Sequence, residues 1–445
     1  MLGLRIGRVL RRASAGAAAL AMFLALGAQA APGWTRADDR AQPMALPDGA
    51  FRVPVENVDG VILVTARARG LSGADTAGFF VLDTGAGALA LDRALAIRLG
   101  IASPDSARED VALAERALPR FEFGERQVDK LSPVLTLNAE VVRAVTDRPV
   151  LGLIGQPLFA NQILQVDYRG EQVTVAPSAP GSHDASPVDR IGRSKLATRA
   201  LIERNAHAVP FELAGDGKIL VRARVGGARA RVVTLVLDTG ATKTVLFVDE
   251  GRPALEGRAP WRALCGLSAP TLFGTESACA VRVPEIRLLS PSGDLIVRAS
   301  DAVELESPLR GLLSQVSGRE IAGLLGYSAL KRHRITLDFA NRVAWFEPEP
   351  ANWDDRENEY SHVGLQIERR SGAIEVVAVA IPSPAEAAGI RAGDLVVSVD
   401  GRSSAGADLF DVANALEGAP GSKVTLVLSR AGIERTYTLR RKRLL

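Results

Sequence analysis

The sequence has 445 residues, with 54 Lys and Arg residues against 51 Asp and Glu residues. A chain of this length can form two to four domains, each with a hydrophobic core of its own. The formal net charge of +3 falls to −1 without the first thirty residues, because these contain four Arg and no acidic residue. A mature chain with so little net charge gives no support for nucleic-acid binding.

Residues 1–30 have the pattern of a secretory signal peptide. Several Arg residues precede an apolar stretch at residues 15–26, and Ala28-Gln29-Ala30 resembles a small-residue cleavage site. The alternative is a membrane anchor, but about 20 apolar residues are needed to cross a bilayer, and this stretch is shorter. We expect cleavage after about Ala30, a periplasmic or secreted mature protein, and no stable membrane span after cleavage. Residues 31–46 are then a polar mature N-terminus.

Two segments, residues 47–179 and 205–350, are dominated by short runs of β-branched residues separated by Gly, Asp and Pro. This pattern predicts that both are mostly β. Residues 180–204, which begin in a stretch rich in Ser, Pro, Gly and Asp, are expected to link them. The helical signals are weaker and are confined to residues 90–99 and a turn after Gly326.

The tripeptide Asp-Thr-Gly occurs once in each segment, at residues 83–85 and 238–240, each time after an apolar run. Downstream of each copy lie two apolar residues and a glycine, Gly155 or Gly326, and then an apolar strand that contains Asp167 or Asp338. Both of these pairs are separated by 171 positions. Solenoid and propeller repeats have periods of about 20–50 residues, so this spacing indicates a duplicated domain.

This repeated order resembles the pepsin and retropepsin-like aspartic proteases over roughly residues 47–350. The resemblance implies two homologous β-barrel lobes that form one cleft. It also implies that Asp83 and Asp238 are catalytic, share a proton and activate a water molecule. We therefore expect no cofactor and no metal. The resemblance implies supporting roles for the loop residues Thr84, Gly85, Thr239, Gly240 and Thr242, and a structural role behind the loops for Gly155 and Gly326.

The chain departs from the pattern of that family in two places. The family often has Ser or Thr two positions after the motif glycine; the second segment keeps Thr242, but the first has Gly87. No Tyr occurs between Asp83 and Leu118 or between residues 238 and 283, so a flap tyrosine is absent. We expect activity that is weak, narrow, or optimal nearer neutral pH than that of pepsin.

The chain contains two cysteines, Cys265 and Cys279, both in the second segment. In an oxidising compartment they are expected to form a disulfide worth about 3 kcal/mol, the alternative being two free thiols. Two cysteines alone do not make a tetrahedral zinc site. The second segment is also longer by about 16 residues between its motif Asp and Gly326. The cysteines lie in this longer part, which is either a disulfide-tied loop near the cleft or a surface insertion facing away from it.

Residues 351–445 form a separate module. Residues 383–386 are a capping box with Pro at the first helical position, and Gly389 ends that short helix. A strand at 395–399, a helix at 409–416 and a strand at 424–428 follow. This order resembles a PDZ domain, in which Gly364, Leu365, Gln366 and Ile367 match the loop that binds a peptide C-terminus. The alternative is a PDZ domain that only packs against the rest of the chain.

Together these observations predict an exported aspartic endopeptidase that hydrolyses peptide bonds, with a PDZ domain that recruits or positions protein substrates. Its expected partners are protein or peptide substrates and a peptide C-terminus at the PDZ domain. One alternative is a non-catalytic peptide-binding protein with an aspartic-protease-like fold. Another is assembly through homodimers, in which each lobe pairs with its copy in a second chain.

Overall fold

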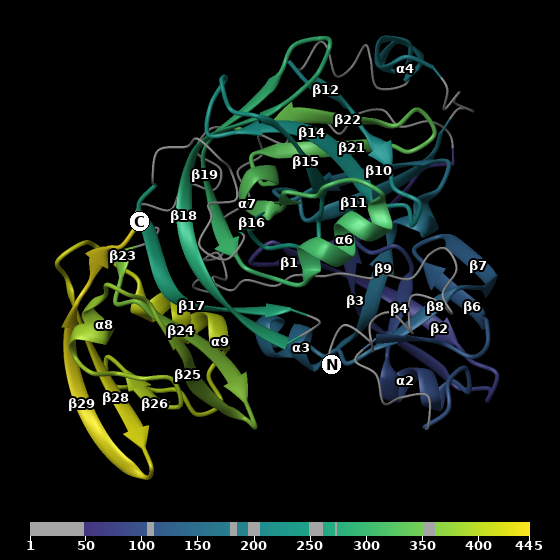
Figure 1. Cartoon of the computed structure of the whole chain (residues 1–445). Coiled ribbons are helices and arrows are strands. Elements are labelled where there is room, and N and C mark those ends of the chain that lie inside the picture. Colours follow the sequence, from purple (N-terminus) through teal and green to yellow (C-terminus); the bar gives the residue numbers. More distant parts are fainter. Residues whose placement is uncertain are drawn as a thin grey trace.

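The computed structural model describes residues 49–104, 111–178, 185–194, 205–248, 261–271, 274–350 and 361–445. The predicted signal peptide and the polar segment 31–46 lie outside the described residues. The chain is mostly β, with short helices between the strands (Figure 1). No helix within the described ranges is long and apolar enough to cross a membrane.

The first unit covers residues 51–177. Its strands are β1 (Phe51–Val58), β2 (Val61–Arg69), β3 (Asp75–Asp83), β4 (Leu89–Asp92), β5 (Val111–Leu113), β6 (Leu118–Phe123), β7 (Arg126–Leu131), β8 (Val134–Leu137), β9 (Val150–Gly155), β10 (Gln162–Asp167) and β11 (Gln172–Pro177). Its helices are α2 (Arg93–Arg98), α3 (Glu140–Thr146) and the 3₁₀ helix η2 (Gln156–Phe159). The helix expected at residues 90–99 begins only at Arg93, because Leu89–Asp92 pairs as a strand with both β8 and β9.

The second unit covers residues 207–348 and is preceded by α4 (Pro187–Arg193). Its strands are β12 (His207–Pro210), β13 (Glu212–Leu213), β14 (Ile219–Val225), β15 (Val232–Leu237), β16 (Thr244–Phe247), β17 (Ala263–Thr271), β18 (Gly274–Leu288), β19 (Leu295–Leu305), β20 (Gly323–Leu325), β21 (His333–Asp338) and β22 (Val343–Pro348). Its helices are α6 (Leu309–Ser317) and α7 (Tyr327–Leu330), and α7 forms the turn expected after Gly326.

The two units repeat one pairing scheme. In the first, β3 runs parallel to β9, β9 is antiparallel to β4, and β4 is parallel to β8. In the second, β15 is parallel to β20, β20 is antiparallel to β16, and β16 is parallel to β19. In both units, the strand that leads into the Asp-Thr-Gly turn therefore lies beside the strand that leads to Gly155 or Gly326. This repetition agrees with the duplication indicated by the sequence.

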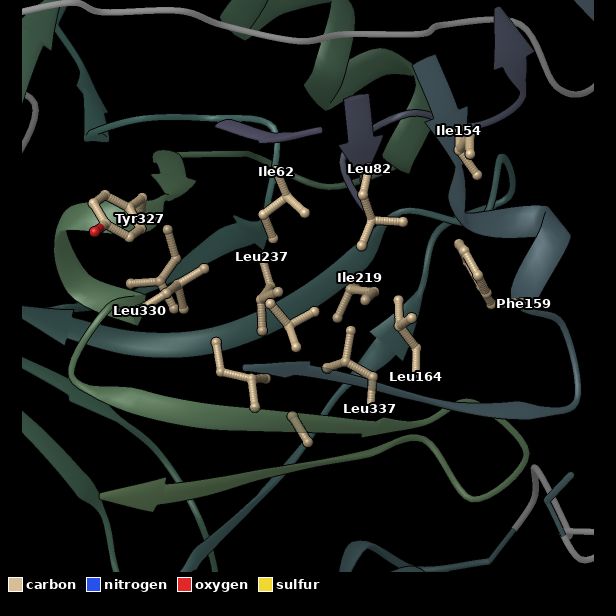
Figure 2. Packing of buried hydrophobic residues seen from close by; sticks show 14 of the residues in the cluster. Ile62, Leu82, Ile154, Phe159, Leu164, Ile219, Leu237, Tyr327, Leu330 and Leu337 are labelled. Carbon is tan, nitrogen blue, oxygen red and sulfur yellow. The ribbon is translucent and has the colours of Figure 1, made fainter. Parts of the chain in front are cut away.

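One sheet joins the two units, because β10 of the first pairs antiparallel with β21 of the second. In this register Gln165 lies opposite Thr336, 171 positions away. The main buried cluster also crosses the boundary: Leu82 and Leu237, which precede the two motif aspartates, belong to it together with Ile62 of β2 and Ile219 of β14 (Figure 2). Since each fully buried aliphatic side chain contributes about 1.5–3 kcal/mol, this core fixes the strand ends that carry the two motifs.

The C-terminal unit contains β23 (Ser361–His362), β24 (Leu365–Arg370), β25 (Ala373–Val379), α8 (Pro384–Ala387), β26 (Leu395–Val399), β27 (Arg402–Ser403), α9 (Leu409–Leu416), β28 (Lys423–Arg430), β29 (Ile433–Arg440) and β30 (Lys442–Arg443). The Ser383 hydroxyl caps α8 by accepting a hydrogen bond from the Glu386 amide at 3.1 Å. The predicted strand at 395–399 and helix at 409–416 have these same bounds in the structure. Along the sheet β24 is an edge strand, followed by β25, β26, β28 and β29.

Candidate functional site

The two Asp-Thr-Gly motifs meet at the boundary between the first and second units. β3 ends at Asp83, and Asp238 directly follows β15, so each carboxylate lies where a buried strand turns. Both side chains are fully buried. A Cβ atom on Gly85 would lie 2.5 Å from Cγ of Asp238, and one on Gly240 would lie 2.7 Å from Cγ of Asp83. Each glycine therefore leaves the space that the carboxylate of the other motif fills.

The threonines of the two motifs are joined by a reciprocal set of hydrogen bonds. The Thr84 amide donates to Oγ1 of Thr239, and the Thr239 amide donates to Oγ1 of Thr84, both at 3.1 Å. The Thr84 hydroxyl donates to the Leu237 carbonyl at 3.0 Å, and the Thr239 hydroxyl donates to the Leu82 carbonyl at 2.9 Å. Because each hydroxyl accepts one bond and donates another, the two loops are held in a fixed relative position.

The two aspartates have matching surroundings. Oδ1 of Asp83 accepts a hydrogen bond from the Gly85 amide, and Oδ1 of Asp238 accepts one from the Gly240 amide, both at 2.8 Å. Oδ2 of each carboxyl is buried and accepts no hydrogen bond from a backbone amide or from a side chain outside the pair among the residues that the structure describes, and a side-chain hydrogen bond between the two carboxyls contributes to their pKa values. These two oxygens are therefore the groups of the site between which a proton can be shared.

Burial dominates the protonation of this pair. Desolvation, followed by the charge of Asp238, raises the pKa of Asp83 well above its usual range. Desolvation also raises the pKa of Asp238 to about 6, although hydrogen bonds to its charged form oppose this rise. Two carboxyls so placed do not both ionise readily, so near neutral pH the pair holds one proton.

Gly155 and Gly326 lie directly behind the two loops. A Cβ atom on Gly155 would be 2.2 Å from the Ala88 carbonyl oxygen, and one on Gly326 would be 2.3 Å from the Lys243 carbonyl oxygen. Neither distance is compatible with a side chain. Thr242, whose role was predicted from the resemblance, is buried next to the second loop.

Two further residues of the site lie outside both Asp-Thr-Gly motifs and were not predicted. Asp216 and Lys218 lie in the turn before β14, are buried, and form an ion pair with each other. Lys218 also interacts electrostatically with both Asp83 and Asp238. A signal was present in the repeat, because Asp216-Gly217-Lys218 aligns with residues 59–61, where an apolar Val61 stands in place of Lys218.

The predicted carboxylate-binding loop of the PDZ domain lies at the start of β24. Gly364 has a positive φ of 89°, and the next three residues begin the strand. The Gln366 side chain is bound to the second unit: its Nε2 donates to the Ser268 carbonyl at 2.8 Å, and its Oε1 accepts from the Ser268 amide at 2.9 Å. One of the four predicted loop residues therefore attaches the PDZ domain to the second unit.

Cys265 and Cys279 form a disulfide that ties β17 to β18. The resulting hairpin contacts the PDZ domain, because the Cys265 amide donates to the Ile381 carbonyl at 3.2 Å and the Ile381 amide donates to the Cys265 carbonyl at 2.8 Å. In the described part of the chain, no group of three or more His, Cys, Asp or Glu side chains is arranged to hold a metal ion.

The comparisons with known proteins concern the C-terminal unit. The PDZ domain family matches residues 375–430. The chain is 44% identical over 73 residues to the chloroplastic C-terminal processing peptidase of Tetradesmus obliquus, which is 16% of each protein. It is 36% identical over 74 residues, 17% of this chain and 16% of the relative, to the carboxy-terminal processing protease CtpA of Bacillus subtilis. The chain thus spans about a sixth of the length of these relatives.

Among solved structures, the PDZ domain of the carboxy-terminal protease from Vibrio cholerae in complex with peptide is 21% identical. The match covers 19% of this chain and 94% of that one, with a TM-score of 0.18. The family match and the order of the elements together show that residues 361–445 contain a PDZ domain.

These comparisons contradict the prediction of an aspartic endopeptidase. The matched relatives are carboxy-terminal processing proteases, and several of them are named serine proteases. The prediction was drawn from the two Asp-Thr-Gly motifs, whereas the family match lies at residues 375–430, far from either motif. The prediction of a hydrolase that cleaves peptide bonds agrees with these relatives, whereas the prediction of an aspartic protease does not. The alternative of a non-catalytic peptide-binding protein gains no more support from them.

Proposed function

We propose that this chain is a protease that acts on proteins whose C-terminal segment is bound by its PDZ domain. The observation that carries the proposal is the PDZ match at residues 375–430, together with the similarity to proteases that process C-termini. In a PDZ domain a peptide adds as a strand to an exposed sheet edge, and its terminal carboxylate is held by backbone amides. β24, which follows the predicted carboxylate-binding loop, is one of the two edge strands of this sheet.

We further propose that the first and second units are two homologous lobes that share one site. The repeated strand pairings and the reciprocal bonds between Thr84 and Thr239 support this proposal. In this proposal the site is centred on Asp83 and Asp238, which share one proton near neutral pH. The supporting residues are Thr84, Gly85, Thr239, Gly240 and Thr242, with Gly155 and Gly326 behind them.

We propose that the protein is exported, in the periplasm or outside the cell. The leader pattern of residues 1–30 supports export. The disulfide between Cys265 and Cys279 is independent support, because disulfides persist in oxidising compartments and are rare in the cytosol.

The test is incubation of residues 31–445 with an unfolded protein substrate from pH 3 to 8, followed by mass spectrometry of the products. Wild type is compared with Asp83→Asn, with Asp238→Asn, and with wild type treated with a serine-reactive fluorophosphonate. Circular dichroism controls for folding. Defined cleavage products support the proposed protease.

The variants and the reagent identify the residues that carry out the cleavage. Loss of products in both Asp variants assigns the chemistry to the carboxylate pair. Loss only after fluorophosphonate treatment assigns it to a serine, as the names of the relatives indicate. A folded protein that yields no products across this pH range overturns the proposal and leaves peptide binding as its function.

A further inference from the structure

The turn that contains Asp216 and Lys218 fills a space left by Gly87, which lies two positions after the first motif. A Cβ atom on Gly87 would lie 2.7 Å from the Asp216 carbonyl oxygen and 3.4 Å from its Oδ2. At the equivalent position, two residues after Gly240, the second unit has Thr242. Gly217, in the same turn, has a positive φ of 91°, and a Cβ on it would lie 2.2 Å from Oε1 of Gln156 in the first unit. The second unit therefore packs this turn tightly against the Asp83 loop.

The ion pair between Asp216 and Lys218 is buried in this turn, where desolvation of its charges opposes folding. Lys218 is fully buried, and its ammonium group contacts the Asp216 carboxylate. Withdrawing an ammonium from water costs several kcal/mol, so a buried Lys needs compensating negative charge. Lys218 interacts with the two motif aspartates as well as with Asp216. The first unit has Val61 at this position, so the fold itself does not require a cation there.

We propose that Lys218, held by Asp216, is a positioning residue that stabilises the singly protonated form of the Asp83–Asp238 pair. Its positive charge favours the one negative charge of the pair and opposes uptake of a second proton. Tyr168 is another titratable group beside the pair: it interacts with Asp238 and packs edge-to-face on Tyr327. Burial raises the pKa of Tyr168 well above its usual range, so its phenol stays neutral.

The test is the ¹³C NMR titration of protein labelled at Asp Cγ, with Asp83→Asn and Asp238→Asn used to assign the pair. In Lys218→Met, uptake of the second proton is expected at a pH higher by about one unit, a ten-fold change in proton affinity. Lys423→Met, an exposed position of the PDZ domain, is the matched control and is expected to titrate like wild type.

The double variant Asp216→Asn/Lys218→Met covers the case in which the single variant does not fold, since it leaves no orphaned carboxylate. It is expected to shift the titration in the same direction. A folded single or double variant with an unchanged titration overturns the proposal. The role of the pair rests on the proposed function, but this measurement does not require cleavage, so the two proposals can fail separately.

A second inference comes from α3 of the first unit, which lies beside the C-terminal unit (Figure 1) and contacts β24, an edge strand of the PDZ sheet. Val142 and Val145 of α3 belong to the same buried cluster as Leu365 and Ile367 of β24 and Leu409 of α9. β24 also contacts α9, so α3 meets the PDZ domain where this strand and this helix adjoin.

The polar contacts of Asp147, which ends α3, fix this arrangement. Its carboxylate accepts two hydrogen bonds from the Arg369 guanidinium, at 2.7 and 3.0 Å, and a longer one from the Leu409 amide at 3.4 Å. The next residue, Arg148, lies 3.6 Å from the Asp408 carboxylate. Asp147 thus joins the end of β24 to the start of α9.

We infer that α3 closes the PDZ peptide-binding edge in cis, so that a peptide C-terminus must displace it. A PDZ ligand adds as a strand to the sheet edge, and here α3 packs on that edge strand. The displaced helix is connected through β9 to Gly155, behind the Asp83 loop. Peptide binding would therefore free the segment that supports one half of the paired-aspartate site.

Hydrogen exchange of residues 365–370 and 409–416 tests whether α3 covers this edge. Asp147→Arg is expected to speed exchange about ten-fold, which corresponds to about 1.4 kcal/mol at 25 °C. The charge-swapped variant Asp147→Arg/Arg369→Asp is expected to restore slow exchange. Glu140→Arg, an equal charge change at an exposed position of α3, is the control. Equal exchange in wild type and Asp147→Arg overturns the inference.

Competition is tested with a fluorescent pool of decapeptides randomised at the C-terminus, with an amidated pool as control. Asp147→Arg is expected to bind the free-carboxylate pool about ten-fold more tightly than wild type and the charge-swapped variant. Binding that is equal in the three proteins, including no binding to any of them, overturns the competition.

Discussion

Thr84 and Thr239 each place one hydroxyl between a backbone amide and a backbone carbonyl of the opposite unit. Every group in this arrangement is buried, so no water replaces a bond that is lost. These bonds thus fix the position of one strand end relative to the other. They hold the aspartates of both motifs in one site.

Substitution of either threonine by valine is expected to destabilise the protein. Valine keeps the shape but leaves an amide and a carbonyl of the other unit buried and unpaired, at about 1–3 kcal/mol for each group. Urea unfolding of Thr84→Val and Thr239→Val measures this loss of free energy of unfolding. Thr65→Val, at an exposed position in β2, is the control and is expected to change little. Stability equal to that of the control in both variants would contradict the role assigned to these bonds.

The duplicated order of motifs was enough to predict that Asp83 and Asp238 come together. Both segments repeat the same sequence of strands, and a repeated pattern predicts a repeated structure. The PDZ elements were also predictable, because a capping box and alternating apolar residues are local signals. The aspartic protease suggested by the Asp-Thr-Gly motifs is contradicted, since several of the relatives matched by the PDZ domain are named serine proteases.

What the sequence did not predict depends on contacts between distant segments. Asp147 and Arg369 are 222 positions apart, and nothing in either local sequence indicates that they meet. The same holds for Gly87 and Asp216, whose contact exists only once the two units pack. The start of α2 was misplaced for a different reason: the apolar run at residues 89–92 fits a strand or a helix, and pairing with β8 and β9 decides the outcome.

The raised pKa of Asp238 predicts a dependence of stability on pH. Because the folded state binds this proton at a pKa of about 6 against an ordinary value of 3.8, the folded protein takes up the proton more readily than the unfolded chain. Its contribution is therefore complete at low pH and is lost as the pH rises through about 6. The free energy of unfolding of wild type relative to Asp238→Asn is expected to fall by roughly 2 kcal/mol over this window.

Urea unfolding of both proteins from pH 4 to 7 measures this difference. Buried His333 and His362, whose pKa values are lowered to about 4, act with the opposite sign, because stability is lost as the pH falls below their ordinary values. Both proteins contain these histidines, so their contribution cancels in the comparison. A difference in free energy of unfolding that does not vary with pH would show that the pKa of Asp238 is not raised.

Introducing a side chain at Gly87 is expected to destabilise the protein. A Cβ there would meet the backbone carbonyl of Asp216 at 2.7 Å, so Gly87→Ala forces the turn before β14 to move, at about 1–3 kcal/mol. Gly192→Ala is the matched control: Gly192 lies in α4 with no atom near its Cβ position, and Ala favours a helix by about 0.5–1 kcal/mol. The two variants are therefore expected to change the urea midpoint in opposite directions. A stabilised Gly87→Ala would contradict the close packing of this turn.

Removal of the disulfide is expected to affect both stability and the attachment of the PDZ domain. Cys265 and Cys279 are separated by 14 positions, and closing a loop of this size contributes about 3 kcal/mol. The Cys265 backbone also pairs with Ile381, so a loosened β17–β18 hairpin weakens one of the contacts that hold the PDZ domain. In Cys265→Ser/Cys279→Ser we expect a lower Tm and faster hydrogen exchange of the Ile381 amide. Wild type treated with a reductant is the control and should show the same exchange. A lower Tm with unchanged exchange at Ile381 would show that the hairpin keeps its contact with the PDZ domain without the disulfide.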